Sequence, residues 1–199
     1  APSGGSEDTS VPSVGATFAR SELILGGQRS GKSRRAESLA RTWLAQSPQH
    51  RAVLIATAHA GDTEMRERIA HHQRERAQRV PGLATVEEPL QLAEALAAHS
   101  RADTLIVVDC LTLWLTNHLM PASGVAGEPP IEPLLQALRA APGPVVLVGN
   151  AIGLGVIPMG REVRDFVDTL GRLNQDVARV CERVTFMAAG LPLTLKGRP

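Results

Sequence analysis

Residues 26–33 read Gly-Gly-Gln-Arg-Ser-Gly-Lys-Ser, which matches the phosphate-binding loop pattern G-x-x-x-x-G-K-[ST]. An apolar run precedes this loop at residues 23–25, and apolar side chains recur at helical spacing after it, in residues 36–44. A strand, a glycine loop and a helix in this order direct backbone N–H groups and the positive end of a helix dipole at phosphate. The alternative is a glycine turn that contains Gly-Lys-Ser by chance, and the flanking pattern argues against it.

Each residue type in the loop pattern has an expected role in binding a nucleotide. The backbone is expected to hold phosphate oxygens, Lys32 to reach the β- and γ-phosphates, and Ser33 to bind Mg²⁺. The predicted nucleotide-binding residues of the loop are Gly26, Gly27, Gln28, Arg29, Ser30, Gly31, Lys32 and Ser33. The sequence therefore predicts a site for a nucleoside triphosphate and its metal ion.

Apolar runs and helical patterns alternate along the rest of the chain. Buried strands are predicted at residues 53–57, 105–109, 145–150 and 184–188, with a short edge strand at 193–195. Helices are predicted at residues 63–78, 90–99, 111–119, 134–139 and 161–183, and residues 85–89 are expected to lead into the second of these. Val163 and Cys181 are expected on the inward side of the last helix. The pattern predicts an α/β fold with a mostly parallel sheet, flanked by helices in three layers.

The length and the N-terminal composition suggest the domain organisation. At 199 residues the chain fits one domain with a full core. Residues 1–20 are rich in Ser, Gly, Pro and Ala and are predicted to form a disordered tail. Residues 21–199 are predicted to form a single nucleotide-binding catalytic domain.

Composition narrows the class of function. A net charge of +1 argues against a general binder of nucleic acid or membrane surfaces. We expect neither a transmembrane helix nor a signal peptide, because no run of about twenty apolar residues and no secretory pattern is present. Cys110 and Cys181 offer no disulfide framework and are expected to be buried thiols. A reducing, cytoplasmic location fits these features.

Asp109 ends the apolar run at residues 105–109. P-loop enzymes carry a carboxylate at such a strand end, where it helps to hold Mg²⁺. The alternative is that Asp109 caps the helix that follows. The two interpretations are compatible, and the presence of a P-loop favours the metal role.

His71 and His72 lie late in the helix predicted at residues 63–78. Neighbours on a helix point about 100° apart, and His72 shares a predicted apolar face with Met65 and Ile69. We therefore expect His72 to be buried and His71 to be exposed and reactive. Spacing alone favours the simpler interpretation of two ordinary surface histidines.

Short motifs spread over residues 23–196 share their order with one known family. They lie at residues 26–33, 55–57, 64–76, 85–88, 109–112, 150–158 and 164–175. Together they resemble the bifunctional adenosylcobinamide kinases and adenosylcobinamide-phosphate guanylyltransferases of cobalamin biosynthesis. This ordered set is far more specific than the P-loop alone.

The resemblance implies a RecA-like sheet, a homotrimer and two activities. The first phosphorylates the hydroxyl of adenosylcobinamide with ATP or GTP. The second transfers GMP from GTP to the resulting adenosylcobinamide phosphate through a histidine-linked GMP, giving adenosylcobinamide-GDP and pyrophosphate. The family histidine maps onto His71, and the resemblance also implies catalysis by Lys32 and Mg²⁺ binding by Ser33 and Asp109. The residues it adds to the nucleotide site outside the loop are Arg68, Glu87 and Asp109.

The chain departs from the family pattern at Ala77 and near Leu83, where family members often carry Pro and Trp, and in the loop after residue 150. The family carries Glu after the Asn of its Asn-Glu-Val-Gly loop, whereas Ala151 follows Asn150 here. Two other functions stay open from the sequence: a nucleotide-binding regulatory switch without guanylyl transfer, and a kinase without the second activity. Retention of GMP on a histidine separates the bifunctional enzyme from both.

Overall fold

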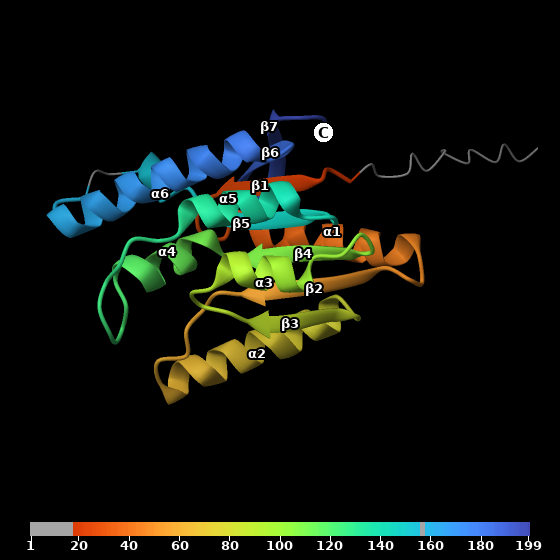
Figure 1. Ribbon diagram of the computed structural model, residues 1–199, viewed down its shortest axis with the longest axis horizontal. Coiled ribbons are helices and arrows are strands. Elements are labelled where there is room, and N and C mark those ends of the chain that lie inside the picture. Colours follow the sequence, from red (N-terminus) through yellow and green to blue (C-terminus); the bar gives the residue numbers. More distant parts are fainter. Residues whose placement is uncertain (1–17, 156–157) are drawn as a thin grey trace, which may run out of the picture.

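The computed structural model describes residues 18–155 and 158–199. A seven-stranded sheet runs through the centre, in the order β3-β2-β4-β5-β1-β6-β7 (Figure 1). The strands are β1 Ser21–Gly26, β2 Arg51–Ala56, β3 Leu83–Glu87, β4 Thr104–Asp109, β5 Val145–Asn150, β6 Arg183–Ala188 and β7 Leu191–Lys196. All neighbouring pairs are parallel except β6 and β7, which are antiparallel.

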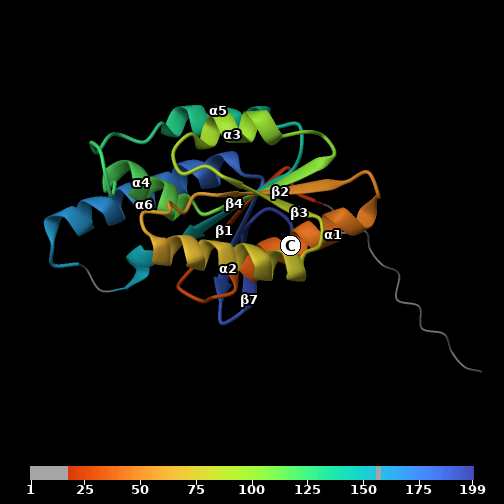
Figure 2. The same ribbon diagram turned by 90° about the horizontal axis from the view of Figure 1, so that it is seen from below.

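Helices cover both faces of this sheet. They are α1 Lys32–Gln46, α2 Thr63–Arg79, α3 Leu92–His99, α4 Leu111–Leu119, α5 Ile131–Ala140 and α6 Arg161–Val180, with a short 3₁₀ turn, η1, at Ile152–Leu154. Helices α3 to α6 pack into one apolar cluster on one face, and α1 packs into a second cluster on the other (Figure 2). The predicted three-layer α/β arrangement with a mostly parallel sheet is therefore confirmed.

The strands are apolar on both faces because both faces are covered. In β1, Leu23 joins the cluster under α6 while Ile24 joins the cluster under α1, and both are fully buried. Side chains alternate between the two faces of a strand. A strand buried on both sides therefore appears in the sequence as a continuous apolar run, which is why β1, β4 and β5 were predictable.

The segment between α2 and α3 differs from its prediction. Residues 83–87 form the edge strand β3, which was not expected from the sequence. Helix α3 begins at Leu92 and not at residue 90. The later start has a local cause, since Glu88 Oε2 accepts the N–H groups of Leu90 and Gln91 and holds them in a turn.

Helices α5 and α6 also differ from their predicted bounds. Helix α5 begins at Ile131, three residues earlier than predicted, and α6 ends at Val180 because the chain enters β6 at residue 183. Cys181 therefore follows the helix and is not part of it. Cys110 and Cys181 are both buried, as predicted, but Val163 is 48% exposed and does not face the core.

The predicted disordered tail, residues 1–20, lies mostly outside the described residues. Of its last residues, Phe18 packs its ring edge-on against Trp43 of α1, with the ring centroids 5.3 Å apart. None of the described helices combines the length and the apolar composition needed to cross a membrane.

Candidate active site

The P-loop connects β1 to α1 at the carboxyl end of the parallel strands. Gly31 has a φ of +103° directly before α1 begins, a conformation that glycine adopts without steric cost. Gly26 lets the end of β1 pass close to β6, because a Cβ at this position would lie 2.6 Å from the carbonyl oxygen of Met187. Helix α1 has no side-chain cap, so its first N–H groups remain available to an anion.

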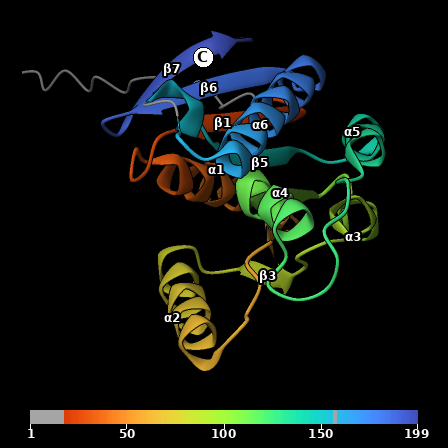
Figure 3. The same ribbon diagram turned by 90° about the vertical axis from the view of Figure 1, so that its left-hand side faces the viewer.

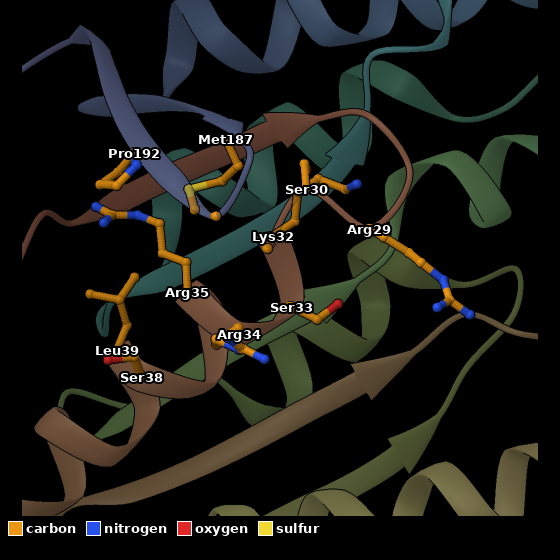
Figure 4. A pocket seen from close by; sticks show the side chains of 12 residues that line it. Arg29, Ser30, Lys32, Ser33, Arg34, Arg35, Ser38, Leu39, Met187 and Pro192 are labelled. Atoms are coloured by element: carbon orange, nitrogen blue, oxygen red, sulfur yellow. The ribbon is translucent and has the colours of Figure 1, made fainter.

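Lys32 lies inside the curve of the loop. Its Nζ donates a hydrogen bond to the carbonyl oxygen of Gly27 across 2.5 Å. Burial lowers the pKa of Lys32 below its usual value, while the nearby Cys110 and Asp109 act in the opposite direction. Ser33 follows Lys32 on the first turn of α1, and its side chain is exposed (Figure 4). The structure thus brings together the predicted phosphate and metal groups of the loop.

Asp109 ends β4 at the same edge of the sheet. It pairs in register with Ala56 of β2, which pairs with Glu87 of β3. The residue that caps α4 is Cys110, whose Sγ accepts the N–H of Leu113 across 3.5 Å. The interpretation of Asp109 as the helix cap is therefore wrong.

The carboxylate of Asp109 is paired with a cationic side chain of helix α2. Arg76 Nη2 of α2 donates to Asp109 Oδ2 across 3.4 Å. Burial raises the pKa of Asp109 above its ordinary value, and the charge of Arg76 opposes that rise. Lys32 also lowers this pKa, so both cations favour the ionised carboxylate.

Ser33 and Asp109 line the same small cavity of about 10 Å³. The described residues contain no group of three or more His, Cys, Asp or Glu side chains that could hold a metal by themselves. Mg²⁺ commonly takes one or two protein oxygens and completes its shell with water and phosphate. The hydroxyl and the carboxylate are the oxygen donors that such an ion requires, so these residues fit Mg²⁺.

Helix α2, which carries both histidines, rests against the body of the protein through charged contacts. None of its residues is buried, and it lies at the side of the sheet beyond α1 (Figure 3). Arg79 donates from Nε and Nη2 to the two carboxylate oxygens of Glu37 on α1, each across 2.9 Å. Arg76 Nε lies 4.0 Å from the same carboxylate.

His71 and His72 do not differ in exposure as predicted. Their side chains are 62% and 61% exposed. Both lie beside Glu75: His71 Nε2 is 3.5 Å from Glu75 Oε1, and His72 Nδ1 is 3.7 Å from Glu75 Oε2. The prediction of a buried His72 is wrong because the face of α2 that bears Met65 is not covered: Met65 itself is 37% exposed. His72 is among the groups that lower the pKa of Asp109, after Arg76 and Lys32.

The other predicted nucleotide-binding residues make their contacts outside the P-loop. Glu87 ends β3 and accepts a hydrogen bond from Gln73 Nε2 across 2.7 Å. Arg68 is exposed on α2. Within residues 18–155 and 158–199, no hydrogen bond or ion pair joins Arg68, Glu87 or His71 to the P-loop.

Two carboxylates that anchor helix α1 were not predicted from the sequence. Glu37 is 8% exposed and holds Arg79, and Glu22 is 2% exposed and accepts from Arg35 Nη2 across 2.7 Å. Both stand among apolar positions of their elements. A carboxylate at such a position is rarely buried without a cationic partner, and this signal could have identified both.

The fold and the loop together define a nucleotide-binding protein of the P-loop class, with a metal-compatible carboxylate two strands away from the loop. The chain belongs to the cobinamide kinase / cobinamide phosphate guanyltransferase family, which matches residues 22–195. The resemblance described from the motifs is thereby confirmed.

The chain matches curated relatives over almost their whole length. It is 50% identical over 179 residues to the bifunctional adenosylcobalamin biosynthesis protein CobP of Pseudomonas aeruginosa, covering 89% of this chain and 98% of that protein. It is 35% identical to the bifunctional adenosylcobalamin biosynthesis protein CobU of Salmonella typhimurium and 33% identical to that of Escherichia coli. Each of these two matches covers 87% of this chain and 98% of the relative.

Among solved structures, the flagellar accessory protein FlaH of Methanocaldococcus jannaschii has a similar fold. The TM-score is 0.51, the identity 13%, and the match covers 91% of this chain and 80% of FlaH. At this identity the likeness concerns the fold alone, and it supports the predicted RecA-like arrangement of the sheet.

Proposed function

We propose that this protein phosphorylates adenosylcobinamide with ATP or GTP and then transfers GMP from GTP to the adenosylcobinamide phosphate. The family and the 50% identity to CobP over nearly the whole chain support both activities. The observation that carries the proposal is the P-loop with Lys32 inside it and Asp109 at the edge of the same sheet. This arrangement suits a transferring phosphoryl group, whose negative charge must be offset.

The phosphates are proposed to lie on the P-loop. Residues 26–33 supply N–H groups, and Lys32 exchanges its hydrogen bond with Gly27 for the β- and γ-phosphate oxygens. Arg68 and Glu87 are proposed to join the nucleotide site when α2 and the end of β3 close on it. The exposed position and the charged contacts of α2 are compatible with such a movement.

Ser33 and Asp109 are proposed to hold Mg²⁺, Asp109 through water. The ion would supply positive charge against the β- and γ-phosphate oxygens. Arg76 must then share Asp109 with the hydrated ion or leave it, because both positive groups use the same carboxylate.

We propose that His71 carries GMP between the two substrates. A neutral ring nitrogen attacks the α-phosphorus of GTP, a P–N bond forms, and the bond to pyrophosphate breaks. An oxygen of adenosylcobinamide phosphate then attacks the same phosphorus, and the P–N bond breaks to release adenosylcobinamide-GDP. Covalent catalysis thus divides one displacement into two easier ones.

The homotrimer implied by the resemblance is part of the proposal. Leu191, Leu193 and Leu195 are 70%, 59% and 57% exposed along the edge strand β7, and a row of exposed leucines on an edge strand favours association. Light scattering coupled to size exclusion measures the assembly directly.

The deciding experiment uses GTP labelled at the α-phosphate. The protein is incubated with labelled GTP and Mg²⁺, denatured and separated by electrophoresis. His71→Ala should lose the acid-labile label and keep most kinase activity, whereas His72→Ala should keep the label. The two side chains are equally exposed, so each variant controls for the other.

Two results would contradict the proposal. A label that persists in His71→Ala, or that maps to another side chain, would exclude His71 as the nucleophile. A wild-type protein that binds GTP and never retains GMP would instead support the regulatory switch or the kinase with one activity.

A further inference from the structure

Strand β5 lies between the strand that leads into the P-loop and the strand that ends in Asp109 (Figure 1). Asn150 is the last residue of β5 and pairs in register with Gly26, the first residue of the loop. Asp109 pairs with Val148, two residues before Asn150. Asn150 therefore ends its strand between the two groups that are proposed to hold the triphosphate and its metal ion.

The alternation of side chains places Asn150 on the face of the sheet that α1 covers. Val148 of β5 belongs to the apolar cluster under α1, and side chains two residues apart on a strand share a face. Asp109 lies two residues after Val107, which belongs to the same cluster. Ser33, on the first turn of α1, lines a cavity together with Asp109. Asn150, Asp109 and the start of α1 thus share one face at one edge of the sheet.

The backbone at Asn150 is held from three directions. Its N–H donates to Thr112 Oγ1 of α4 across 3.0 Å, and its carbonyl oxygen accepts from Asn174 Nδ2 of α6 across 3.4 Å. The N–H of Ala151, the next residue, donates to the carbonyl oxygen of Gly26 across 3.0 Å. The end of β5 is therefore fixed against the P-loop, as a group that acts on developing charge without reorganisation requires.

The side-chain amide of Asn150 is not used by the fold. Within residues 18–155 and 158–199, this half-buried amide makes no hydrogen bond. The two other asparagines of the chain use theirs internally: Asn117 Nδ2 donates to the carbonyl oxygens of Thr57 and Pro89, and Asn174 Nδ2 donates to Asn150. An amide carries two donors and an acceptor oxygen, so Asn150 has all of them available to a ligand.

We propose that Asn150 is a further catalytic residue of the kinase step, in which its Nδ2 donates a hydrogen bond to an oxygen of the γ-phosphate. This role rests on the proposed function. In that step the hydroxyl oxygen of adenosylcobinamide bonds to the γ-phosphorus, and the bond from this phosphorus to the β–γ bridging oxygen breaks. The nucleoside diphosphate leaves with the electron pair, and the hydroxyl proton passes to solvent. Asn150 gains and loses no proton; it aligns the γ-phosphoryl group and stabilises its charge.

The position next to the loop makes this role specific to one of the two activities. Guanylyl transfer breaks a bond at the α-phosphorus and leaves the γ-phosphate inside pyrophosphate. A contact with the γ-phosphate is then the same before the reaction and in its transition state, and such uniform binding does not accelerate the chemical step. The other neighbour of β1, strand β6, ends in Ala188, which has no polar side chain to take the same role.

The test measures two single-turnover rates on the complete chain, each at saturating nucleotide with Mg²⁺. One is the phosphorylation of adenosylcobinamide by ATP, and the other is the labelling of the protein by GTP labelled at the α-phosphate. Asn150→Ala removes the amide, whereas Asn150→Asp keeps its shape and replaces the donor by a carboxylate oxygen. Asn174→Ala is the matched control, because it removes a hydrogen bond to the end of β5 and leaves the amide of Asn150 in place.

Both Asn150 variants should phosphorylate adenosylcobinamide about 100-fold more slowly than the wild type, and their labelling rate should stay within about threefold of it. Asn174→Ala should keep the wild-type ratio of the two rates. A wild-type kinase rate in folded Asn150→Asp, equal losses of both rates in the Asn150 variants, or the same change of ratio in Asn174→Ala would overturn the role.

Failure of the proposed function gives different results. A wild type that phosphorylates no adenosylcobinamide refutes the kinase and this role with it. A wild type that phosphorylates but takes no label refutes guanylyl transfer alone. The kinase rates of the three variants then decide: a loss in both Asn150 variants and not in Asn174→Ala supports the role, and any other pattern overturns it.

Discussion

Arg76 Nη2 lies 3.4 Å from Asp109 Oδ2, which joins the histidine-bearing helix α2 to the carboxylate at the end of β4. Both side chains are largely buried, at 14% and 24% exposure. No residue of helix α2 is fully buried. Its position therefore depends on polar contacts such as this one, the neighbouring pair of Glu37 with Arg79 and the hydrogen bond from Gln73 to Glu87.

Removing the Arg76 contact should loosen α2. Arg76→Gln is expected to speed amide hydrogen exchange in α2 and to lower the free energy of unfolding by about 1–2 kcal/mol, because Asp109 loses a charged donor. Arg74→Gln, on an exposed position of the same helix, is the control and should exchange like the wild type. Equal exchange rates in the two variants would show that Arg76 does not hold α2.

Lys32→Ala should abolish most phosphoryl transfer. Loss of a positive charge beside the transferring group is expected to cost about 3–4 kcal/mol of transition-state stabilisation, or roughly 10²–10³-fold in rate. The fold should persist, because within the described residues this ammonium donates only to the carbonyl oxygen of Gly27. Single-turnover kinase assays measure the loss, and a folded Lys32→Ala protein with near-normal turnover would refute the role.

Asp109→Asn should raise the Mg²⁺ concentration needed for half-maximal rate by roughly 10–100-fold, the effect expected for a group that acts through the ion's water shell. Stability should fall less than in Arg76→Gln, because the amide oxygen of the new side chain can still accept from Arg76 Nη2. Asp103→Asn, directly before β4 at its other end, is the control. If the metal dependence of the two variants coincides, Asp109 has no role in holding the ion.

Ala151 stands next to the P-loop, since its N–H donates to the carbonyl oxygen of Gly26 across 3.0 Å. Ala151→Glu restores the residue that the family carries and is expected to raise the kinase rate more than guanylyl transfer. Both rates are measured on the same preparation. Unchanged rates would mean that this loop acts through its backbone.

The buried thiols predict a loss of stability at alkaline pH. Burial raises the pKa of Cys110 and of Cys181 to about 11, whereas an unfolded cysteine has a pKa of about 8.5. The unfolded state therefore releases its protons first. The free energy of unfolding should fall as the pH rises from about 8.5 to 11, by up to about 1.4 kcal/mol per pH unit for each thiol.

Urea unfolding of the wild type and of Cys181→Ala at pH 8 and pH 10 checks this sign. The wild type should lose more stability than the variant between the two values, because the variant lacks one of the thiols. Parallel losses would indicate that Cys181 ionises as readily in the folded protein as in the unfolded chain.

The sequence by itself determined the P-loop and the sheet around it. Residues 21–33 specify the strand, the loop and the helix start through local patterns, and the position of Asp109 follows from the end of an apolar run. The loop and the helix start depend only on residues that are neighbours in the chain. The strands are recognisable because they are covered on both faces and therefore form continuous apolar runs. The positions of Lys32 and Ser33 at the start of a helix could therefore be predicted from local patterns alone.

Only the tertiary structure decided what surrounds these groups. Periodicity shows which residues of α2 share a face, but not whether another element covers that face, and so the burial of His72 was predicted wrongly. The partners Arg76–Asp109 and Arg79–Glu37 are 33 and 42 residues apart in the chain. Their contacts depend on where α2 rests against the edge of the sheet. Charged contacts between separate elements leave no periodic pattern in the sequence, because each needs only one residue on each side.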